Sequence, residues 1–282
     1  MTHWIISTDL DGTLLDHHTY SYQSAMPAIK KSLSKGIPII FNTSKTLPET
    51  IDVQKEIGVS SPFIIENGAA VYLPKTLYRE LTDHIKSKSC REDYQYFYNS
   101  LGIKREKILD HLSKLKTEFN YDFTGFSELS DKQLMALTGL ELIQAQNAKA
   151  RSFSEPVIWE DSAVQLKNFK MQLKQVGLKV LKGGRFYHIQ GHNNKGKALI
   201  WLKNLYQKFY HNIDASYDVK VIALGDSEND VDMLNCSDIP VIIRSNNHKA
   251  PSVNHKQQII SNNIGPLGWN NEVLNILNKQ KT

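Results

Sequence analysis

The chain has few of the residues that would place it in a secreted or membrane class. It contains only two cysteines, Cys90 and Cys236, too few for a disulfide-stapled scaffold, and their spacing matches no metal motif. No apolar run approaches the roughly 18 residues that a membrane-spanning helix needs. The N-terminal residues also lack the basic and long apolar regions of a signal peptide. We therefore expect a cytoplasmic protein that does not enter a membrane.

The chain also has only a small excess of one sign of charge over the other. Lys plus Arg number 34 against 29 for Asp plus Glu, which gives a net charge of +5. These charges are spread along the chain, and no dense basic run is interleaved with aromatic residues, so nothing favours a nucleic-acid partner. With 40% hydrophobic and 22% charged residues, the composition is that of a globular protein with one large or two smaller domains. The small excess of positive charge suits a small anionic ligand.

Short apolar runs that end abruptly in polar residues recur along the chain. Each of the first two is followed by a helical pattern, and the alternation resumes late with a helix at 195–209. Strands alternating with helices in this way predict a doubly wound, Rossmann-like α/β fold with an open parallel sheet. The predicted strands of this sheet lie at 4–8, 37–41, 63–65, 219–224 and 239–243.

The middle of the chain has a different texture. Amphipathic helices there alternate with short strands, which indicates an α+β domain inserted into the parallel one. We expect a core of residues 1–82 and 185–282, and an inserted domain of residues 83–184. The inserted helices are predicted near 104–118, 130–149 and 162–176, and its strands near 94–98, 156–159 and 178–182.

Polar residues gather where the predicted parallel strands end. Ligands of open parallel sheets bind at the carboxyl ends of the strands, so residues far apart in the sequence are expected to meet at one edge. Three aspartates, a hydroxyl and a lysine are the main chemical groups. The complete set is Asp9 and Asp11 after the first strand, Thr43 and Ser44 after the second, Asp226, Asn229 and Asp230 after a late strand, and Lys195 at a helix start.

This set contains the groups that phosphoryl transfer needs. A phosphate monoester is a dianion that repels a carboxylate, and Mg²⁺, which prefers oxygen ligands, can neutralise it. The carboxylates of Asp9 and Asp226 suit the metal, with the backbone carbonyl of Asp11 as a third ligand. Asp9 is then the nucleophile that forms an aspartyl-phosphate, and Asp11 is the general acid and base. Thr43 and Lys195 would hold the phosphate oxygens.

Each motif alone has a structural alternative. Asp-x-Asp also occurs in calcium loops, in glycosyltransferases and on solvated turns. Asp226 could be a helix N-cap, and Lys195 a surface lysine. The joint occurrence of all roles, each after an apolar strand and each filled once, favours the catalytic interpretation over a catalytically silent binding protein.

The same residues resemble a known superfamily. Asp-Leu-Asp-Gly-Thr-Leu-Leu at 9–15, Thr43, Lys195 and Gly-Asp-x-x-Asn-Asp at 225–230 resemble the four motifs of haloacid dehalogenase (HAD) enzymes. Asp11 is typical of their phosphatase branch. The resemblance implies a HAD-like fold, a magnesium-dependent phosphoric monoester hydrolase and an aspartyl-phosphate, with Asn229 and Asp230 supporting the metal. The insertion resembles the α/β cap of the Cof-type branch, which closes over the site and selects the substrate.

Further segments resemble a narrower family, the mannosyl-3-phosphoglycerate phosphatases. The resemblance implies hydrolysis of mannosyl-3-phosphoglycerate, a small phosphorylated sugar acid, to mannosylglycerate. Two departures are Asn194, where the family usually has Asp, and the pair His17-His18. The segments that carry the resemblance are 42–46, 63–69, 137–140, 154–156, 183–186 and 265–270.

Substrate choice is less constrained by sequence than the reaction. A carboxylated substrate needs extra donors, for which Arg185 and Lys45 are candidates, with Arg151 and Lys167 as others. We assign Ser44, Lys45, Asn67 and Arg185 to substrate binding. Strand alternation around His188 predicts a hydrogen-bonded core histidine.

Other functions remain open at this stage. A glucosyl-3-phosphoglycerate phosphatase or a general sugar-phosphate phosphatase is the alternative within the same reaction, and a phosphomutase the alternative outside it. The sequence is compatible with a monomer or a homodimer.

Overall fold

The computed structural model describes residues 2–82, 91–93, 95–182 and 186–279, and the chain divides into two compact units. Unit 1 comprises Met1–Ser44, Gln54–Ser100 and Asn194–Thr282, and unit 2 comprises Lys45–Val53 and Leu101–Asn193. We expected the insertion to span 83–184. The divisions lie later in the sequence, and a short segment from the first half of the chain joins unit 2.

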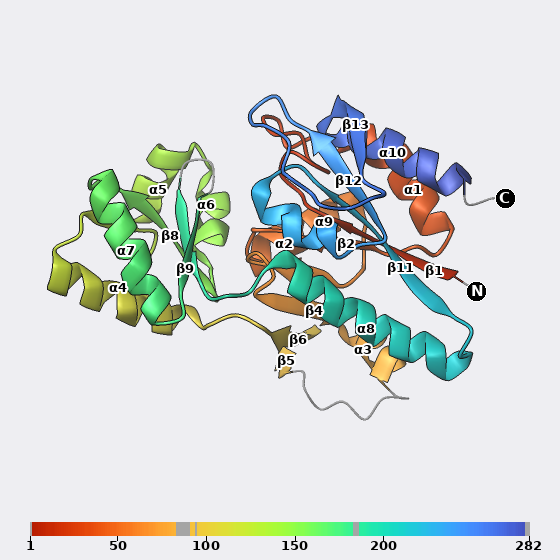
Figure 1. Cartoon of the computed structure of the whole chain (residues 1–282), viewed down its shortest axis with the longest axis horizontal. Coiled ribbons are helices and arrows are strands. Elements are labelled where there is room, and N and C mark those ends of the chain that lie inside the picture. Colours follow the sequence, from red (N-terminus) through yellow and green to blue (C-terminus); the bar gives the residue numbers. More distant parts are fainter. Residues whose placement is uncertain (1, 83–90, 94, 183–185, 280–282) are drawn as a thin grey trace. The chain divides into compact units, whose positions relative to one another are not determined.

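A nine-stranded sheet forms the centre of the described part of unit 1 (Figure 1). Neighbouring strands from β13 to β3 are parallel, and those from β3 to β5 are antiparallel. The predicted doubly wound α/β fold is therefore confirmed. In spatial order the strands are β13 (Ile259–Ile264), β12 (Ile239–Arg244), β11 (Asp218–Gly225), β1 (Thr2–Thr8), β2 (Ile39–Asn42), β3 (Phe63–Ile65), β4 (Ala70–Pro74), β6 (Tyr96–Ser100) and β5 (Arg91–Asp93).

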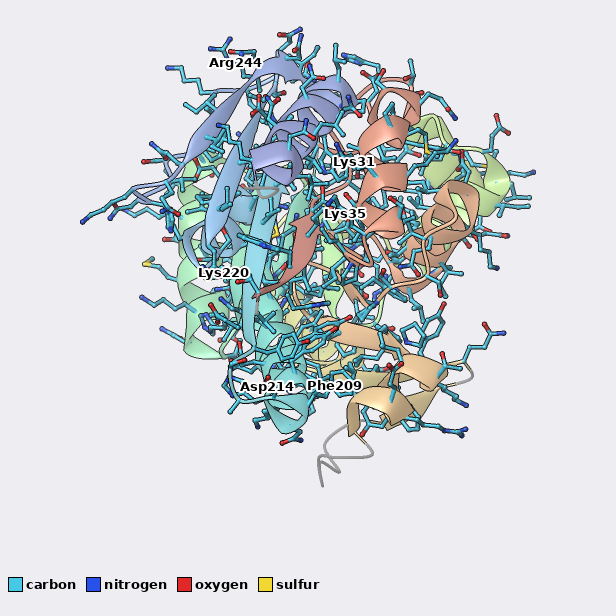
Figure 2. The ribbon with its side chains drawn as sticks, turned by 90° about the vertical axis from the view of Figure 1, so that its right-hand side faces the viewer. Lys31, Lys35, Phe209, Asp214, Lys220 and Arg244 are labelled. Atoms are coloured by element: carbon cyan, nitrogen blue, oxygen red, sulfur yellow. The ribbon has the colours of Figure 1, made fainter. Side chains whose placement is uncertain are left out.

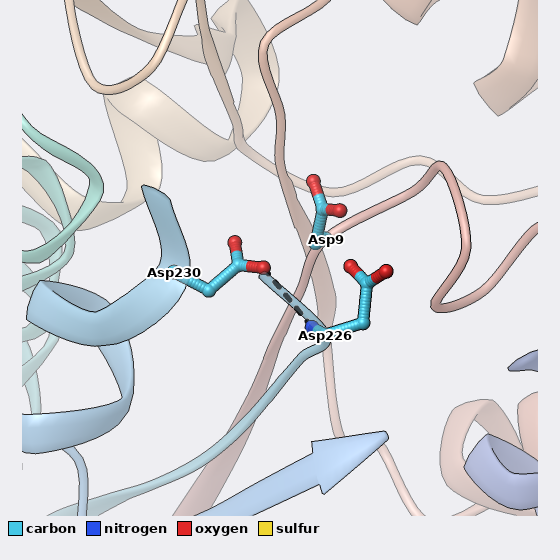
Figure 3. Close-up of side chains that lie close together, drawn as sticks. All are labelled: Asp9, Asp226 and Asp230. Atoms are coloured by element: carbon cyan, nitrogen blue, oxygen red, sulfur yellow. Dashed lines mark hydrogen bonds between the residues drawn. The ribbon is translucent and has the colours of Figure 1, made fainter. Parts of the chain in front are cut away.

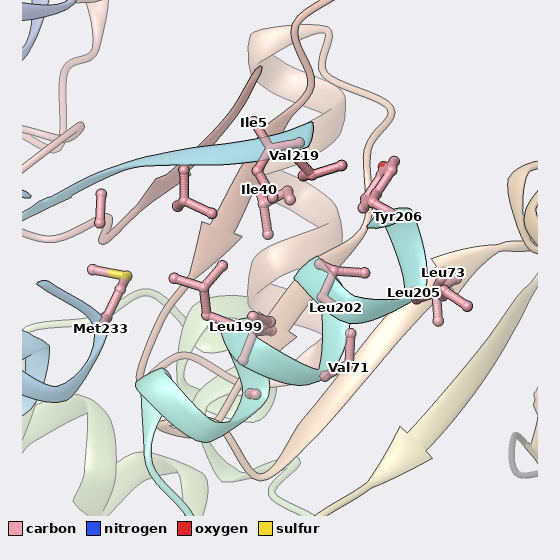
Figure 4. Packing of buried hydrophobic residues seen from close by; sticks show 14 of the residues in the cluster. Ile5, Ile40, Val71, Leu73, Leu199, Leu202, Leu205, Tyr206, Val219 and Met233 are labelled. Carbon is pink, nitrogen blue, oxygen red and sulfur yellow. The ribbon is translucent and has the colours of Figure 1, made fainter. Parts of the chain in front are cut away.

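Strand β1 is apolar on both faces because helices cover both sides of the sheet. On one face Ile5 packs in a buried cluster with Leu199 and Leu202 of α8 (Lys195–Ile213), as Figure 4 shows. On the other face Trp269 of α10 (Gly265–Lys279) is fully buried, and its indole N–H donates to Thr8 Oγ1 at 2.9 Å. Because both faces of β1 are buried, we expect apolar residues on both faces of the strand and not an alternation of apolar with polar residues.

Helix α1 (Met26–Ser34) packs beside α10. The Asn270 side chain accepts a hydrogen bond from the backbone N–H of Ala28, and Lys31 Nζ donates to Asn278 Oδ1 at 2.6 Å. In Figure 2 the labelled basic residues Lys31, Lys220 and Arg244 lie apart, on α1, β11 and β12. The remaining helical segments of unit 1 are η1 (Gln23–Ala25), α3 (Lys75–Thr82), η2 (Glu228–Asp230) and α9 (Val231–Asn235), and α2 (Leu47–Ile57) is shared with unit 2.

The strand predicted near 94–98, in which tyrosines alternate with other residues, belongs to unit 1 rather than to the inserted domain. Tyr98 on β6 pairs with Tyr72 on β4, and their rings stack with centroids 5.1 Å apart. Tyr96 lies on the same strand, whereas Tyr94 lies outside the described residues. This antiparallel extension of the core sheet explains why the chain leaves unit 1 near residue 100. A strand with alternating aromatics does not reveal which sheet it joins.

Unit 2 contains a four-stranded antiparallel sheet in the order β7-β8-β10-β9. Phe169 and Leu173 of α7 pack with Phe123, Val157 and Ile108 in its apolar core. Strand β10 lies within residues 185–282, which we expected to belong to the core, but it pairs with β8 and β9 here, so the return crossing comes after residue 193. The strands are β7 (Phe123–Gly125), β8 (Ser154–Trp159), β9 (Lys179–Lys182) and β10 (Tyr187–Gln190), and the helices are α4 (Arg105–Phe119), α5 (Asp131–Thr138), α6 (Leu142–Lys149) and α7 (Ala163–Gln175).

Two local features of unit 2 differ from expectation. The single helix predicted at 130–149 is two helices, because Gly139 ends α5 with a left-handed φ of 78°. Thr46 Oγ1 donates to the Asn147 carbonyl at 2.8 Å, and Asn147 Nδ2 donates to Asp52 at 2.8 Å. These bonds explain why residues 45–53 join this unit. Among the described residues, no helix is both long enough and apolar enough to cross a bilayer.

Gly68 is the position in the β3–β4 turn where a side chain is least tolerable. Its φ is +84°, and a Cβ there would lie 2.0 Å from the Asn194 carbonyl oxygen, just before α8. Gly58 has a similar φ of +76° but no atom within 4 Å of its virtual Cβ. Alanine substitutions at the two glycines therefore separate two costs: that of a left-handed backbone, which both share, and that of a close contact, which only Gly68 has.

We expect Gly58→Ala to lower the free energy of unfolding by about 1 kcal/mol, the cost of a left-handed alanine. Gly68→Ala should lower it by about 1–3 kcal/mol more, because the turn must move away from α8. Denaturant titration of both variants measures the difference. Equal losses would show that the turn does not need its close approach to α8.

Candidate active site

Three aspartates meet at the carboxyl ends of β1 and β11 (Figure 3). Asp9 follows β1 and Asp226 follows β11, and the two strands are parallel neighbours whose register pairs Thr8 with Leu224. Asp230 ends the short helix η2. All three side chains are buried, and one carboxylate oxygen from each lies within 4.8 Å of the others. The structure thus brings Asp9, Asp226 and Asp230 together, as their places at strand ends predict.

Lys195 is the cation of this cluster. It is the first residue of α8 and is fully buried, and its Nζ lies 2.6 Å from Asp9 Oδ1 and 2.6 Å from Asp230 Oδ1. Burial alone would lower the pKa of Lys195, but the two adjacent carboxylates, Asp230 first, raise it above its usual range. The side chain is therefore an ammonium ion, and the surface-lysine alternative is wrong.

Asn194 holds the start of α8 in place. Its side-chain oxygen accepts a hydrogen bond from the Lys197 backbone N–H at 2.7 Å, which is an N-cap. Asn and Asp cap helices about equally well. The departure from the family's usual Asp therefore preserves the local structure that presents Lys195.

Asp230 is saturated with hydrogen bonds. Its Oδ1 pairs with Lys195, and its Oδ2 accepts from the backbone N–H groups of Asp226 at 3.0 Å and Ser227 at 3.1 Å. Gly225 makes room for it, since a Cβ at Gly225 would lie 2.5 Å from the Asp230 Cβ. Asp230 thus fixes the loop that carries Asp226 and orients Lys195.

Asp226 is held at both oxygens. Thr13 Oγ1 donates to Oδ1 at 3.1 Å, and His248 Nε2 lies 3.0 Å from Oδ2. Burial first, and then the charge of Asp230, raises the pKa of Asp226 to about 6, although His248 opposes the shift. Sequence reasoning missed both partners. Thr13 lies inside the 9–15 motif, which could have indicated it, whereas nothing in the sequence around His248 points to this contact.

Asp9 combines one held oxygen with one available oxygen. Lys195 donates to Oδ1 at 2.6 Å, which is the hydrogen bond that the Asp9 carboxylate accepts among the described residues, so Oδ2 remains available. Burial raises the pKa of Asp9, as do the neighbouring charges of Asp230 and Asp226, while Lys195 opposes the shift. An oriented carboxylate with one oxygen available is the geometry of a nucleophile.

Hydrogen bonds join the loops after β2, β3 and β11. Thr43 is buried, and its carbonyl accepts from the Asn67 N–H at 2.9 Å. Asn67 has a left-handed φ of 57°, and its Oδ1 accepts from Asn229 Nδ2 at 3.1 Å. Thr43, Asn67 and Asn229 therefore belong to one connected rim with the aspartates.

The remaining predicted site residues are not drawn into the cluster. Asp11 is half-buried, two residues after Asp9, and its side chain is outside the group of three. Ser44 ends the first segment of unit 1, while Lys45 belongs to unit 2. Arg185 lies outside the described residues. The roles of these four residues stay predictions.

The charge and chemistry of the cluster fit a divalent metal. Three carboxylates face a single ammonium in a buried place, so ionising all of them leaves an excess of negative charge that a divalent cation would neutralise. The donors are hard oxygen atoms, which such cations prefer. Asp230 Oδ1 pairs with Lys195 and its Oδ2 already accepts two backbone hydrogen bonds, whereas each oxygen of Asp9 and Asp226 has at most one partner, so Asp9 and Asp226 are the carboxylates best placed to bind it.

Comparisons with known proteins agree with this chemistry. Residues 6–265 match the family model of haloacid dehalogenase-like hydrolases. The chain is 38% identical over 276 residues to a glucosyl-3-phosphoglycerate/mannosyl-3-phosphoglycerate phosphatase of Persephonella marina, covering 98% of this chain and 97% of that protein. A protein of the same description from Methanococcoides burtonii is 37% identical over 279 residues, with the same coverage. A solved structure from Streptococcus mutans aligns with a TM-score of 0.63 at 16% identity, covering 97% of this chain and 98% of that one, which supports the fold alone.

The raised pKa of Asp226 predicts how the stability of the metal-free protein depends on pH. Its folded-state pKa of about 6 exceeds the ordinary 3.8, so the folded chain keeps a proton that the unfolded chain releases. This contribution to stability is complete below the ordinary value and is lost as pH rises through the folded value. Asp226→Asn removes the buried charge. The melting temperature of the Asp226→Asn variant in EDTA should therefore fall less than that of the wild type between about pH 5 and about pH 8.

Asp16→Asn is a control of opposite sign. Hydrogen bonds from the backbone N–H groups of Thr19 and His18 lower the pKa of Asp16, so its ionised form stabilises the fold at neutral pH. Removing that charge should lower the melting temperature there. Identical pH profiles for Asp226→Asn and the wild type would contradict the proposed cost of the buried charge.

Proposed function

The chain belongs to the haloacid dehalogenase-like hydrolase family, as its motifs indicate, and on that premise we propose that it is a magnesium-dependent phosphatase of mannosyl- and glucosyl-3-phosphoglycerate. The observation that carries the reaction type is Asp9, which is oriented by Lys195 through one oxygen while the other is available. The two relatives, whose names include both esters, support the proposed substrate class.

We assign two roles to the residues of the cluster: some bind the metal, and others support the loop that carries a metal ligand. Asp9, Asp226 and the backbone carbonyl of Asp11 would bind Mg²⁺, while Asn229 and Asp230 support the loop that carries Asp226. When bound, the ion neutralises the phosphate dianion so that a carboxylate can approach it.

The first half of the reaction transfers the phosphoryl group to the protein. With Oδ1 held by Lys195, Asp9 attacks phosphorus through Oδ2, and the bond from phosphorus to the ester oxygen breaks. Asp11 donates a proton to that leaving oxygen, so the sugar acid leaves with a hydroxyl group where the phosphate was bound. The Lys195 ammonium and the Thr43 hydroxyl hold phosphate oxygens as their charge redistributes.

The second half regenerates Asp9. Asp11, now ionised, takes a proton from a water molecule that attacks the phosphorus of the aspartyl-phosphate. The bond from phosphorus to the Asp9 oxygen breaks, and inorganic phosphate leaves. Asp11 therefore serves first as acid and then as base, and one carboxyl group with access to water is enough for both steps.

We propose that unit 2 is the cap that selects the substrate. Within it, Arg151 donates to Ser154 Oγ at 3.0 Å, and burial together with the Arg151 charge lowers the pKa of His188 to about 3. The ring of His188 is therefore neutral, and its buried Nδ1 has no partner among the described residues. It is not the hydrogen-bonded core histidine that we expected. A guanidinium beside a neutral imidazole suits a ligand with a carboxylate and hydroxyl groups.

Asp9→Asn should abolish phosphate release while leaving the fold intact, because the amide is a neutral isostere and a poor nucleophile. Turnover is measured as inorganic phosphate, and the covalent intermediate as a phosphorylated peptide containing Asp9 after acid quenching. Asp232→Asn, at an exposed position of α9, is the matched control and should keep both signals. Retained turnover in Asp9→Asn would remove the covalent mechanism.

The substrate assignment is tested by phosphate release with Mg²⁺ from four esters. We expect kcat/KM for mannosyl-3-phosphoglycerate and glucosyl-3-phosphoglycerate to exceed that for 3-phosphoglycerate and mannose-6-phosphate by about tenfold or more, or about 1.4 kcal/mol of transition-state discrimination.

The relative rates on the control substrates separate the alternatives. Equal rates on mannose-6-phosphate would indicate a general sugar-phosphate phosphatase. Transfer of phosphate within a sugar, without release to water, would indicate a phosphomutase. Either outcome would contradict the proposed substrate while leaving the Asp9 chemistry to its own test.

A further inference from the structure

His248 reaches the acidic cluster from a separate part of the fold. It lies on the connection between β12 and β13, 22 residues after Asp226, and its Nε2 lies 3.0 Å from Asp226 Oδ2. The histidine side chain is 35% exposed, whereas the Asp226 side chain is 3% exposed. A loop residue whose side chain is about one-third exposed thus contacts a carboxylate that is almost completely buried.

The contact completes a set of constraints on the Asp226 carboxylate. Thr13 Oγ1 holds Oδ1 at 3.1 Å, and His248 holds Oδ2. A Cβ at Gly12 would lie 2.6 Å from the same Oδ2, so the Gly12 backbone also packs against this group. With one donor on each oxygen, rotation of the carboxylate is blocked, and each oxygen keeps a lone pair for another ligand.

The imidazole ring also has a contact on its other side. His248 Nδ1 lies 3.2 Å from the Lys249 carbonyl oxygen. A neutral imidazole carries one N–H, and the Asp226 carboxylate can accept only from an Nε2–H, so in the neutral ring the Nδ1 approach is a packing contact and Nε2 is the donor to Asp226.

We propose that His248 is a positioning residue that orients the Asp226 carboxylate for the divalent cation and thereby tightens metal binding. The proposal rests on the metal assignment of the proposed function. Hydrogen-bond donors to metal-binding side chains typically change metal affinity by about 10–100-fold. They do so because a ligand that is already oriented loses less freedom when the metal binds.

A competing effect has the opposite sign. A positive charge on His248 would repel the metal, and its removal would then strengthen binding. Two features favour the orienting effect: the ring is one-third exposed, so water screens its charge, whereas Asp226 is buried, so its orientation cannot relax into solvent.

The experiment measures Mn²⁺ binding without substrate, by isothermal titration calorimetry and by the electron paramagnetic resonance signal of free Mn²⁺. Mn²⁺ is used because it shares the preference of Mg²⁺ for carboxylate and water ligands. His248→Ala should weaken the affinity by about tenfold or more. His248→Gln, whose amide can donate to the same oxygen, should restore most of it.

His255→Ala is the matched control. His255 lies on the same connection, and its ring accepts only a local bond from the Gln257 backbone N–H at 3.2 Å. Its Mn²⁺ affinity should equal that of the wild type. Melting curves in EDTA should be alike for all variants, and a variant that melts early is replaced in the comparison by His248→Gln alone against the wild type.

The outcomes distinguish this proposal from the proposed function. Unchanged or tighter Mn²⁺ binding by His248→Ala would overturn the positioning role, as would a His248→Gln variant that binds as weakly as His248→Ala. A wild-type chain that binds no Mn²⁺ would overturn the metal assignment and this inference together. Wild-type binding with no difference among variants would remove only the role of His248.

Discussion

The buried ammonium of Lys195, placed between Asp9 and Asp230, is the interaction on which the site depends. An isolated charge without water costs several kcal/mol, so Lys195 can be buried only where carboxylates meet it. Here two carboxylates lie at 2.6 Å, from residues 186 and 35 positions away in the sequence. Strand β1, helix η2 and helix α8 must therefore converge. Glycines at 68 and 196 permit that approach, because a Cβ at either would lie within 2.4 Å of a neighbouring backbone oxygen.

Burial of the carboxylates in this cluster opposes folding but favours the reaction. Burial raises the pKa values of Asp9 and Asp226, so holding both ionised without a metal opposes folding, while the same burial strengthens electrostatic effects on a bound phosphate. Asp230 has a different role because its hydrogen bonds are complete. One lysine, one fully bonded aspartate and two aspartates with remaining capacity form a preorganised set that a cation completes.

Sequence patterns identified the core of the fold and most of the rim. The apolar runs before Asp9, Asn42 and Glu66 are strands because burial on both faces demands unbroken hydrophobicity. The split helix at Gly139 and the sheet joined by Tyr98 were not foreseen, because a periodic pattern records that a face is buried but not against which partner. The boundaries of the two units depend on those pairings, between β6 and β4 and between β10 and β8.

The sequence by itself determined the reaction type, since Asp9, Asp11, Thr43, Lys195 and Asp226 each follow or begin an element whose end can be read locally. Only the tertiary structure decided how the aspartates divide their work, because that depends on which oxygen each donor reaches. Thr13 and His248 on Asp226, and Lys195 shared by Asp9 and Asp230, are contacts across distant segments. Such contacts arise from the packing of β1, β11 and α8, and no local pattern in the sequence reveals how these elements pack.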